Sequence, residues 1–223
     1  MALPFRSSAT PGPGAWLMLD AAWPVAAVGL WDAGAWRAFV RTEGPAVEAL
    51  FGAIDTAFAT AGIALGDVAG YLYAGGPGSI LGLRTAAMAL GTWRAAPGLN
   101  RKPVLAYDSI VIASRLAALE GLPASTVFAA ARRDRWNALP PGAQVPLECD
   151  ANALAGLPAP YLRLPARDLG RPPVDAAIFD PVAALGRRPE IFLSPGLLAE
   201  TATPDAANAA NKYAEWTGGR HRA

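Results

Sequence analysis

The sequence contains one cysteine, one histidine and few charged residues. Cys149 has no second cysteine to pair with, which excludes an internal disulfide framework and a multi-cysteine zinc site. His221, the only histidine, lies two residues from the end of the sequence. Its position argues against a Ser-His-Asp triad, a Cys-His pair and a multi-histidine metal site. These shortages predict a chain without catalytic residues and without a metal.

A large excess of positive or negative charge and long hydrophobic runs are also missing. The formal net charge is +1, so the chain lacks the positive field that drives unaided nucleic-acid binding. No run of 18 apolar residues free of charge and proline occurs, so no segment is expected to span a membrane. Residues 1–14 have no apolar run of signal-peptide length, and we expect a cytoplasmic location. With 53% hydrophobic residues, the chain should bury a core.

Hydrophobic periodicity divides the first half of the chain into strands and helices. Three apolar runs joined by very short links predict an antiparallel meander at residues 15–20, 25–31 and 36–41. The period then becomes helical at residues 45–61, and Gly62 should end this helix. The further predicted elements are a buried strand at 67–74, a helix at 79–93, a strand at 103–107 and a helix from Asp108 or Ser109 to Leu119.

This order of elements favours an α/β fold of the actin/sugar-kinase (RNase H-like) type with two lobes, the second smaller and less regular. We expect a flexible arm at residues 1–14, an N-terminal lobe at 15–108 and a C-terminal lobe at 109–223. The second lobe should pair strands 126–131 and 136–139, with loops over most of 140–173. Further expected elements are strands at 178–179 and 190–193, a short helix opening at Ser194 or Pro195, and a helix at 205–216.

A glycine-rich segment, residues 75–85, lies between a predicted buried strand and a predicted helix. Ser79 can cap that helix, and a free helix N-terminus suits anions, so a phosphate site is one interpretation. The spacing fits neither common phosphate motif. Gly82 is not followed by lysine, and Leu81 stands where the dinucleotide fingerprint needs glycine. A tight strand–helix turn without a ligand is therefore the favoured interpretation.

The helix after this segment carries two rows of small residues: Gly82, Ala86 and Ala89 in one, and Ala87 and Gly91 in the other. Small side chains allow a second helix to approach closely. One face can be explained by internal packing against residues 45–61, and the other could accept a helix from a partner.

The segment Gly76-Pro-Gly-Ser-Ile-Leu-Gly-Leu-Arg84 resembles the glycine-proline-glycine-serine-phenylalanine-threonine-glycine-leucine-arginine signature of the TsaB (YeaZ) family. Residues 17–20 look like the opening strand of that family, and residues 130–132 resemble its later aspartate-alanine-arginine element. Several substitutions mark a divergent member: Ala21 and Ala22 for Thr-Ser, Ile80 and Leu81 for Phe-Thr, and Ala130 for aspartate.

The resemblance implies a non-catalytic scaffold subunit that pairs with TsaD in threonylcarbamoyladenosine modification of tRNA. It implies a heterodimer with a TsaD-like protein, a TsaE-like ATPase as a further partner, tRNA contact only through the complex, and no cofactor. The helices flanking the glycine loop would form the interface. The expected interface residues are Gly76, Pro77, Gly78, Ser79, Gly82, Leu83, Ala86, Ala87 and Leu90.

Two alternatives stay open at this point. One is a nucleotide-binding enzyme of the sugar-kinase/actin superfamily, and the other is a homodimer through the same helix face. Arginines at 132, 133 and 135 and at 220 and 222 could touch tRNA phosphates, although a solvated surface cluster is the favoured interpretation. Asp20 is interpreted as a turn residue, and Cys149 has no neighbouring histidine to activate it.

Overall fold

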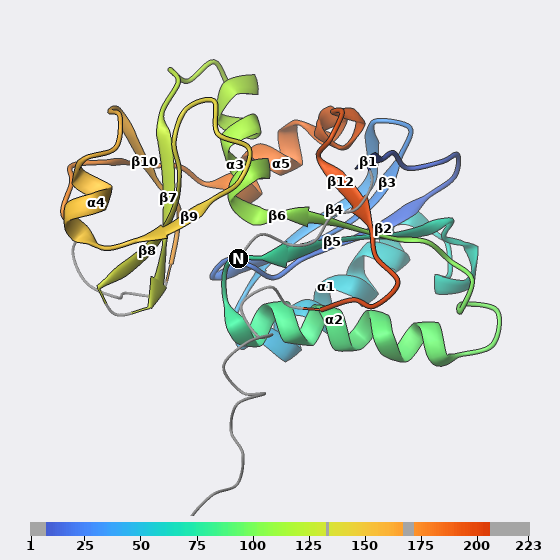
Figure 1. Ribbon diagram of the computed structural model, residues 1–223. Helices are drawn as coiled ribbons and strands as arrows, with labels where there is room; N and C mark the ends of the chain where they lie inside the picture. Colours follow the sequence, from blue (N-terminus) through green and yellow to red (C-terminus); the bar gives the residue numbers. More distant parts are fainter. Residues whose placement is uncertain (1–7, 133, 167–171, 206–223) are drawn as a thin grey trace, which may run out of the picture.

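Three antiparallel strands open the first sheet of the computed structural model, which describes residues 8–132, 134–166 and 172–205 (Figure 1). Ala33 and Gly34 join the second strand to the third, with φ angles of 48° and 91°. A two-residue hairpin turn of type I′ needs this left-handed backbone at both positions. The predicted meander is confirmed, as β2 (Trp16–Asp20), β3 (Val25–Asp32) and β4 (Ala35–Glu43).

Two helical crossovers extend the sheet. The first helix ends at Gly62, whose φ of 67° and N–H bond to the Phe58 carbonyl form a left-handed cap, as predicted. The strand that follows runs parallel to β2 and to the next strand, as a helical crossover requires. These elements are α1 (Ala46–Ala61), a 3₁₀ turn (Leu65–Asp67), β5 (Gly70–Gly76), α2 (Ile80–Ala95) and β6 (Val104–Asp108).

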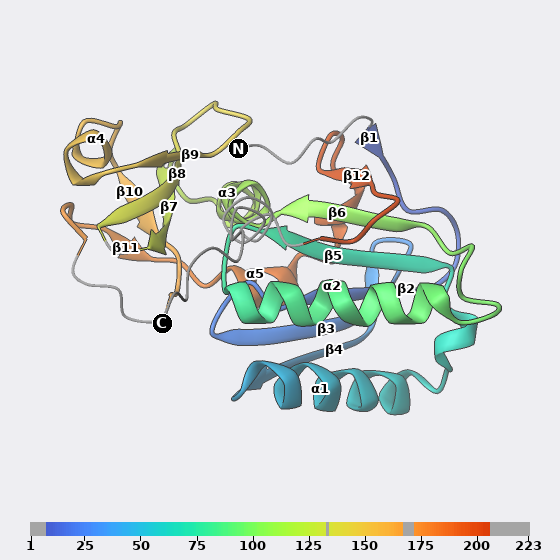
Figure 2. The same cartoon turned by 60° about the horizontal axis from the view of Figure 1, so that its bottom comes forward.

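The strand order is β1-β12-β6-β5-β2-β3-β4, and helices cover both faces of this sheet (Figure 2). Alternation along β2 shows how the two faces are filled. Leu17 and Leu19 belong to the core under α1 and α2, whereas Trp16 and Met18 belong to the core shared with α3 (Ser109–Leu119). All four side chains are buried, so this strand lies at the centre of the molecule.

A second, smaller sheet follows α3, with strand order β11-β10-β7-β8-β9. Its central hairpin confirms the predicted pairing, because Val127 lies opposite Leu139 in an antiparallel ladder. The sheet and its short helix lie at one end of the first sheet in both views (Figures 1 and 2). The elements are β7 (Thr126–Arg132), β8 (Arg135–Leu139), β9 (Leu147–Cys149), α4 (Ala151–Ala155), β10 (Tyr161–Arg163) and β11 (Ala177–Ile178).

The last described part of the chain returns to the first sheet. Helix α5 (Pro181–Arg187) packs near β3 and β4, and β12 (Leu198–Glu200) pairs with β6 and with β1 (Ser8–Ala9). The arm expected at residues 1–14 therefore contains a short strand. The predicted boundary between the two lobes near residue 108 stays a prediction. Strand β12, which lies after that boundary in the sequence, joins the sheet of the first lobe.

Two predicted elements near the C-terminus are wrong. Residues 190–193 were expected to form a strand, but Pro189–Leu193 is a 3₁₀ helix in which the Ser194 N–H bonds back to the Ile191 carbonyl. The helix expected to open at Ser194 or Pro195 is replaced by β12. The helix expected at 205–216 lies outside the described residues except for Asp205.

The fold class is confirmed as α/β with two sheets. The core order β4-β3-β2-β5-β6, with β3 antiparallel to its neighbours, is that of an RNase H-like, actin/sugar-kinase-type lobe. Within the described ranges, every helix is too short or too polar to cross a bilayer.

Candidate functional site

The glycine-rich segment forms the turn between β5 and α2. Gly76 ends the strand with a φ of 108°, which a residue with a side chain rarely adopts, and Pro77 follows it through a cis peptide bond. Ser79 caps α2 as predicted, because its Oγ accepts a hydrogen bond from the Gly82 N–H at 3.4 Å.

The same segment packs directly on the β2–β3 loop. The Ser79 N–H donates to the Ala22 carbonyl oxygen at 2.8 Å. A Cβ added at Gly78 would overlap the Ala22 carbonyl, and one added at Gly82 would overlap the carbonyl oxygen of Ala21. These two glycines are therefore explained by a close approach between two stretches of backbone. Because carbonyl oxygens already lie against the start of α2, the geometry disfavours a phosphate there.

Asp20 lies at the end of β2 and is only 1% exposed. Its carboxylate accepts hydrogen bonds from the Ala22 N–H at 3.0 Å and from the Tyr107 hydroxyl at 2.9 Å. Burial raises the pKa of Asp20, and these hydrogen bonds offset part of that effect. Burial and the neighbouring carboxylate also raise the pKa of Tyr107 well above its ordinary value. Asp20 thus holds a turn in place, as interpreted from the sequence, and is closed to a ligand.

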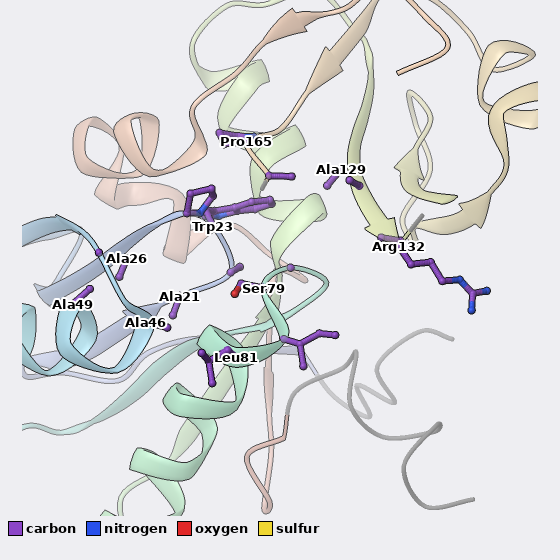
Figure 3. A pocket seen from close by; sticks show the side chains of 18 residues that line it. Ala21, Trp23, Ala26, Ala46, Ala49, Ser79, Leu81, Ala129, Arg132 and Pro165 are labelled. Carbon is purple, nitrogen blue, oxygen red and sulfur yellow. The ribbon is translucent and has the colours of Figure 1, made fainter. Parts of the chain in front are cut away.

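A cavity of about 520 Å³ lies between the two lobes (Figure 3). Trp23 extends into the space between Pro165 of the second lobe and the start of α2, where Ser79 and Leu81 lie. We call this space the inter-lobe cavity. Its walls are Ala21, Ala22, Trp23, Pro24, Ala26, Gly44, Ala46, Ala49, Gly78, Ser79, Ile80, Leu81, Ala129, Ala130, Ala131, Arg132, Pro165 and Ala166.

Most of the predicted interface residues lie inside the chain, and their contact with a partner stays a prediction. Ala86 is 1% exposed. It belongs, with Leu90, to the core around Leu50 and Ile54 of α1. Internal packing, the alternative weighed for one face, therefore accounts for this row. Gly76, Gly82, Leu83, Ala86, Ala87 and Leu90 are buried, and Pro77, Gly78 and Ser79 are half-buried.

Large apolar side chains that the small-residue pattern does not reveal lie on the outward sides of α1 and α2. Residues four or seven positions apart share one side of a helix, which groups Val47 with Phe51 and Leu81 with Met88. Their exposed fractions are 45%, 41%, 56% and 72%. Ile80, beside Leu81, is 46% exposed. We call these five side chains the two-helix face. On α2, Leu81 and Met88 lie opposite the buried residues, whereas on α1 Val47 and Phe51 lie at the edge of the buried stripe.

The basic cluster near residue 132 is paired within the second lobe. Arg132 and Arg135 both donate to Glu148, at 2.7 and 3.1 Å, and all three side chains are at least one-third exposed. Such pairs fit the solvated-surface interpretation. The other predicted basic residues, Arg133 and the cluster at 220–222, lie outside the described residues.

Two observations concern metal binding and the single cysteine. Across residues 8–132, 134–166 and 172–205, no group of three histidine, cysteine, aspartate or glutamate side chains could hold a metal. Cys149 is buried, and burial raises the pKa of its thiol, which disfavours the reactive thiolate.

Comparison with known proteins adds the fold assignment. No family model matches the chain, and no curated protein matches its sequence. YeaZ from Pseudomonas aeruginosa is 18% identical with a TM-score of 0.56, over 77% of this chain and 89% of YeaZ. This chain has the YeaZ fold. A second structure, of an uncharacterized protein with similarity to the peptidase YeaZ from Pseudomonas aeruginosa, is 22% identical with a TM-score of 0.50, over 78% and 90% of the two chains. The resemblance to the TsaB (YeaZ) family is thus confirmed in fold.

Proposed function

We propose that this protein is a divergent, non-catalytic TsaB-like scaffold subunit that pairs with a TsaD-like protein in threonylcarbamoyladenosine modification of tRNA. The observation that carries the proposal is the YeaZ fold, which extends over most of both chains. The Gly76–Arg84 signature supports it further, because the segment lies between β5 and α2 and Ser79 caps the helix. A TsaE-like ATPase and tRNA would meet this chain only within the complex.

A scaffold role agrees with the contacts within the chain that occupy the groups at the end of β2 and at the start of α2. Asp20, the carboxylate at the end of β2, is held by the Ala22 N–H and the Tyr107 hydroxyl and has almost no exposed surface. The start of α2 is covered by the β2–β3 loop. A peptidase role, which the name of one structural neighbour mentions, needs an activated nucleophile or a metal-bound water. The described side chains support neither, since Cys149 is buried and they include no metal cluster.

The two-helix face is the surface through which we propose that the partner binds. Single exposed apolar residues are common, but here five large ones lie on two helices that contact each other. Helix α1 contains no lysine or arginine, and its acidic Glu48 and Asp55 are exposed beside Val47 and Phe51. The matching surface of the partner would be apolar with basic residues at its edge.

A mixing experiment with the TsaD-like protein of the same organism tests this proposal. The wild-type chain should elute with that protein as one complex in sizing chromatography at micromolar concentrations. Lysine substitution of Phe51 and Met88 together should abolish the complex, because it places two charges in an apolar contact. Ile178→Lys is the matched control, since Ile178 is 77% exposed on β11 of the other sheet.

Each outcome separates the parts of the proposal. A wild-type chain that never forms a complex would remove the scaffold role. A complex that tolerates Phe51→Lys with Met88→Lys but not Ile178→Lys would move the interface to the second sheet. If the wild-type chain alone forms a dimer that the same pair of substitutions breaks, the homodimer alternative is correct.

A further inference from the structure

We propose that the inter-lobe cavity is a binding site for a neutral, largely apolar small molecule. Ile80 and Leu81 belong both to this cavity and to the two-helix face, whereas Phe51 and Met88, the positions changed in the docking test, do not line the cavity. A volume of about 520 Å³ falls in the range of cavities that enclose drug-sized ligands, roughly 300–1,000 Å³. Sites of this kind form preferentially between domains, and here both lobes contribute walls.

The residues that line the cavity disfavour a charged ligand. Nine of the 18 lining residues are alanine, and Trp23, Ile80 and Leu81 are the large apolar residues among the others. Arg132 is the one charged residue in this lining, and its guanidinium donates to Glu148 and extends away from Trp23 (Figure 3). A charged ligand would lose its hydration in this apolar site without gaining a partner of opposite charge, so it should bind much more weakly than a neutral one.

The cavity also lies where the sequence-based alternative would place a nucleotide between the lobes, and its walls do not fit one. The start of α2 is the natural phosphate position, yet the Ala22 carbonyl accepts the Ser79 N–H there and the Ala21 carbonyl lies against Gly82. Carbonyl oxygens repel phosphate oxygens. Asp20 cannot hold a phosphate-bound metal from this side, because its oxygens are engaged by Ala22 and Tyr107.

The alanines set the width of the cavity. Ala46 begins α1 in the first lobe, and Ala131 lies on β7 in the second, and both are half-buried lining residues. A larger side chain at either position would extend into open space and fill it. In an ordinary packing defect such a change raises the melting temperature of the protein and has no other effect. In a binding site it also removes affinity for the ligand.

Titration with the neutral fluorescent probe N-phenyl-1-naphthylamine tests the site in the full-length protein. The wild-type chain should bind one probe molecule with saturation, whereas ATP with magnesium should give no heat of binding in calorimetry. Ala46→Leu and Ala131→Leu should each weaken probe binding about tenfold or more while keeping the melting temperature at or above that of the wild type. Ala59→Leu is the matched control, because Ala59 is exposed on α1 and does not line the cavity.

Every result bears on the proposal. Probe binding that is lost in both cavity variants and kept in Ala59→Leu supports it. It is overturned by a wild-type chain that does not bind the probe, by probe binding that both cavity variants retain, or by ATP binding that Ala46→Leu weakens. None of these outcomes depends on the TsaD-like protein, so the docking proposal is tested separately.

Discussion

The two sides of α2 differ in what they leave for a second molecule. On the inward side, Gly82 and Ala86 are buried, one against the β2–β3 loop and the other in the core that includes α1. On the outward side, Leu81 and Met88 are exposed and apolar. Gly82 and Ala86 thus pack within the chain, whereas Leu81 and Met88 are exposed to solvent.

This difference extends to the ends of the central strands. In many enzymes of α/β type, loops at the carboxyl ends of parallel strands carry the chemistry. Here Asp20 and Asp108 stand at the ends of β2 and β6. Asp20 accepts hydrogen bonds from the Ala22 N–H and the Tyr107 hydroxyl, and Asp108 from the Ile110 and Val111 N–H groups. These two carboxylates are thus engaged in contacts within the chain.

The largest effect should come from a charge placed on the inward side of α2, and the same charge on the outward side should have little effect. Ala86→Arg puts a guanidinium into a site that is 1% exposed, and we expect it to cost about 4 kcal/mol or more of unfolding free energy. Met88→Arg, at a site 72% exposed, should change stability by less than about 0.5 kcal/mol. Urea unfolding of the two variants measures both values. Equal stabilities would mean that the inward and outward sides have been assigned incorrectly.

A smaller effect should separate two glycines of the same helix. Gly82→Ala places a Cβ against the Ala21 carbonyl oxygen and should destabilise the protein by about 3 kcal/mol. Gly91→Ala meets no atom within 4 Å and should stabilise it by about 0.5–1 kcal/mol, since alanine is the better helix former. Thermal unfolding distinguishes the two. A neutral Gly82→Ala would show that the β2–β3 loop moves away easily and that the start of α2 can open.

The smallest of these effects is a pH dependence from Asp108. Burial raises the pKa of this carboxyl from 3.8 to about 6, although its hydrogen bonds from the Val111 and Ile110 N–H groups act in the opposite direction. The folded state therefore holds the proton more tightly than the unfolded state. Its contribution to stability is fully present below pH 4 and is lost as the pH rises to about 6.

Asp108→Asn keeps an oxygen acceptor for the α3 N-cap but has no proton to lose. The stability of the wild type relative to this variant should fall by roughly 2 kcal/mol between pH 4 and pH 7. Chemical unfolding at several pH values measures the difference. The contribution of Glu120 to stability should change with pH in the opposite direction, because hydrogen bonds from Arg187 and Arg188 lower the pKa of its carboxyl. A constant difference between wild type and Asp108→Asn would contradict the buried position of this carboxyl.

Much of the first sheet could be predicted from the sequence, because each element carries its own periodic signal. The meander at residues 15–41 alternates or runs apolar between very short turns, and Gly62 and Ser79 are recognisable helix ends. The short strands β1 and β12 gave no such signal, since two or three residues are too few for a period. Their pairing is set by the tertiary structure, which returns the chain to β6.

The orientation of α2 could not be predicted, although its span was. A row such as Gly82, Ala86 and Ala89 permits close packing, and the pattern is the same whether the neighbour belongs to this chain or to another. The structure buries this row, and we therefore propose the opposite side of α2 as the interface. The inter-lobe cavity was also invisible, because alanines from distant segments such as 46–49 and 129–131 acquire meaning only when the two lobes meet.

The affinity of the TsaD-like protein for this chain, measured by calorimetric titration, is the most direct test of surface recognition as its function. The account predicts a measurable dissociation constant for the wild type, the same value for Ile178→Lys, and an increase of about tenfold or more for Met88→Lys. Equal dissociation constants in all three proteins, or no heat of binding with the wild type, would contradict it.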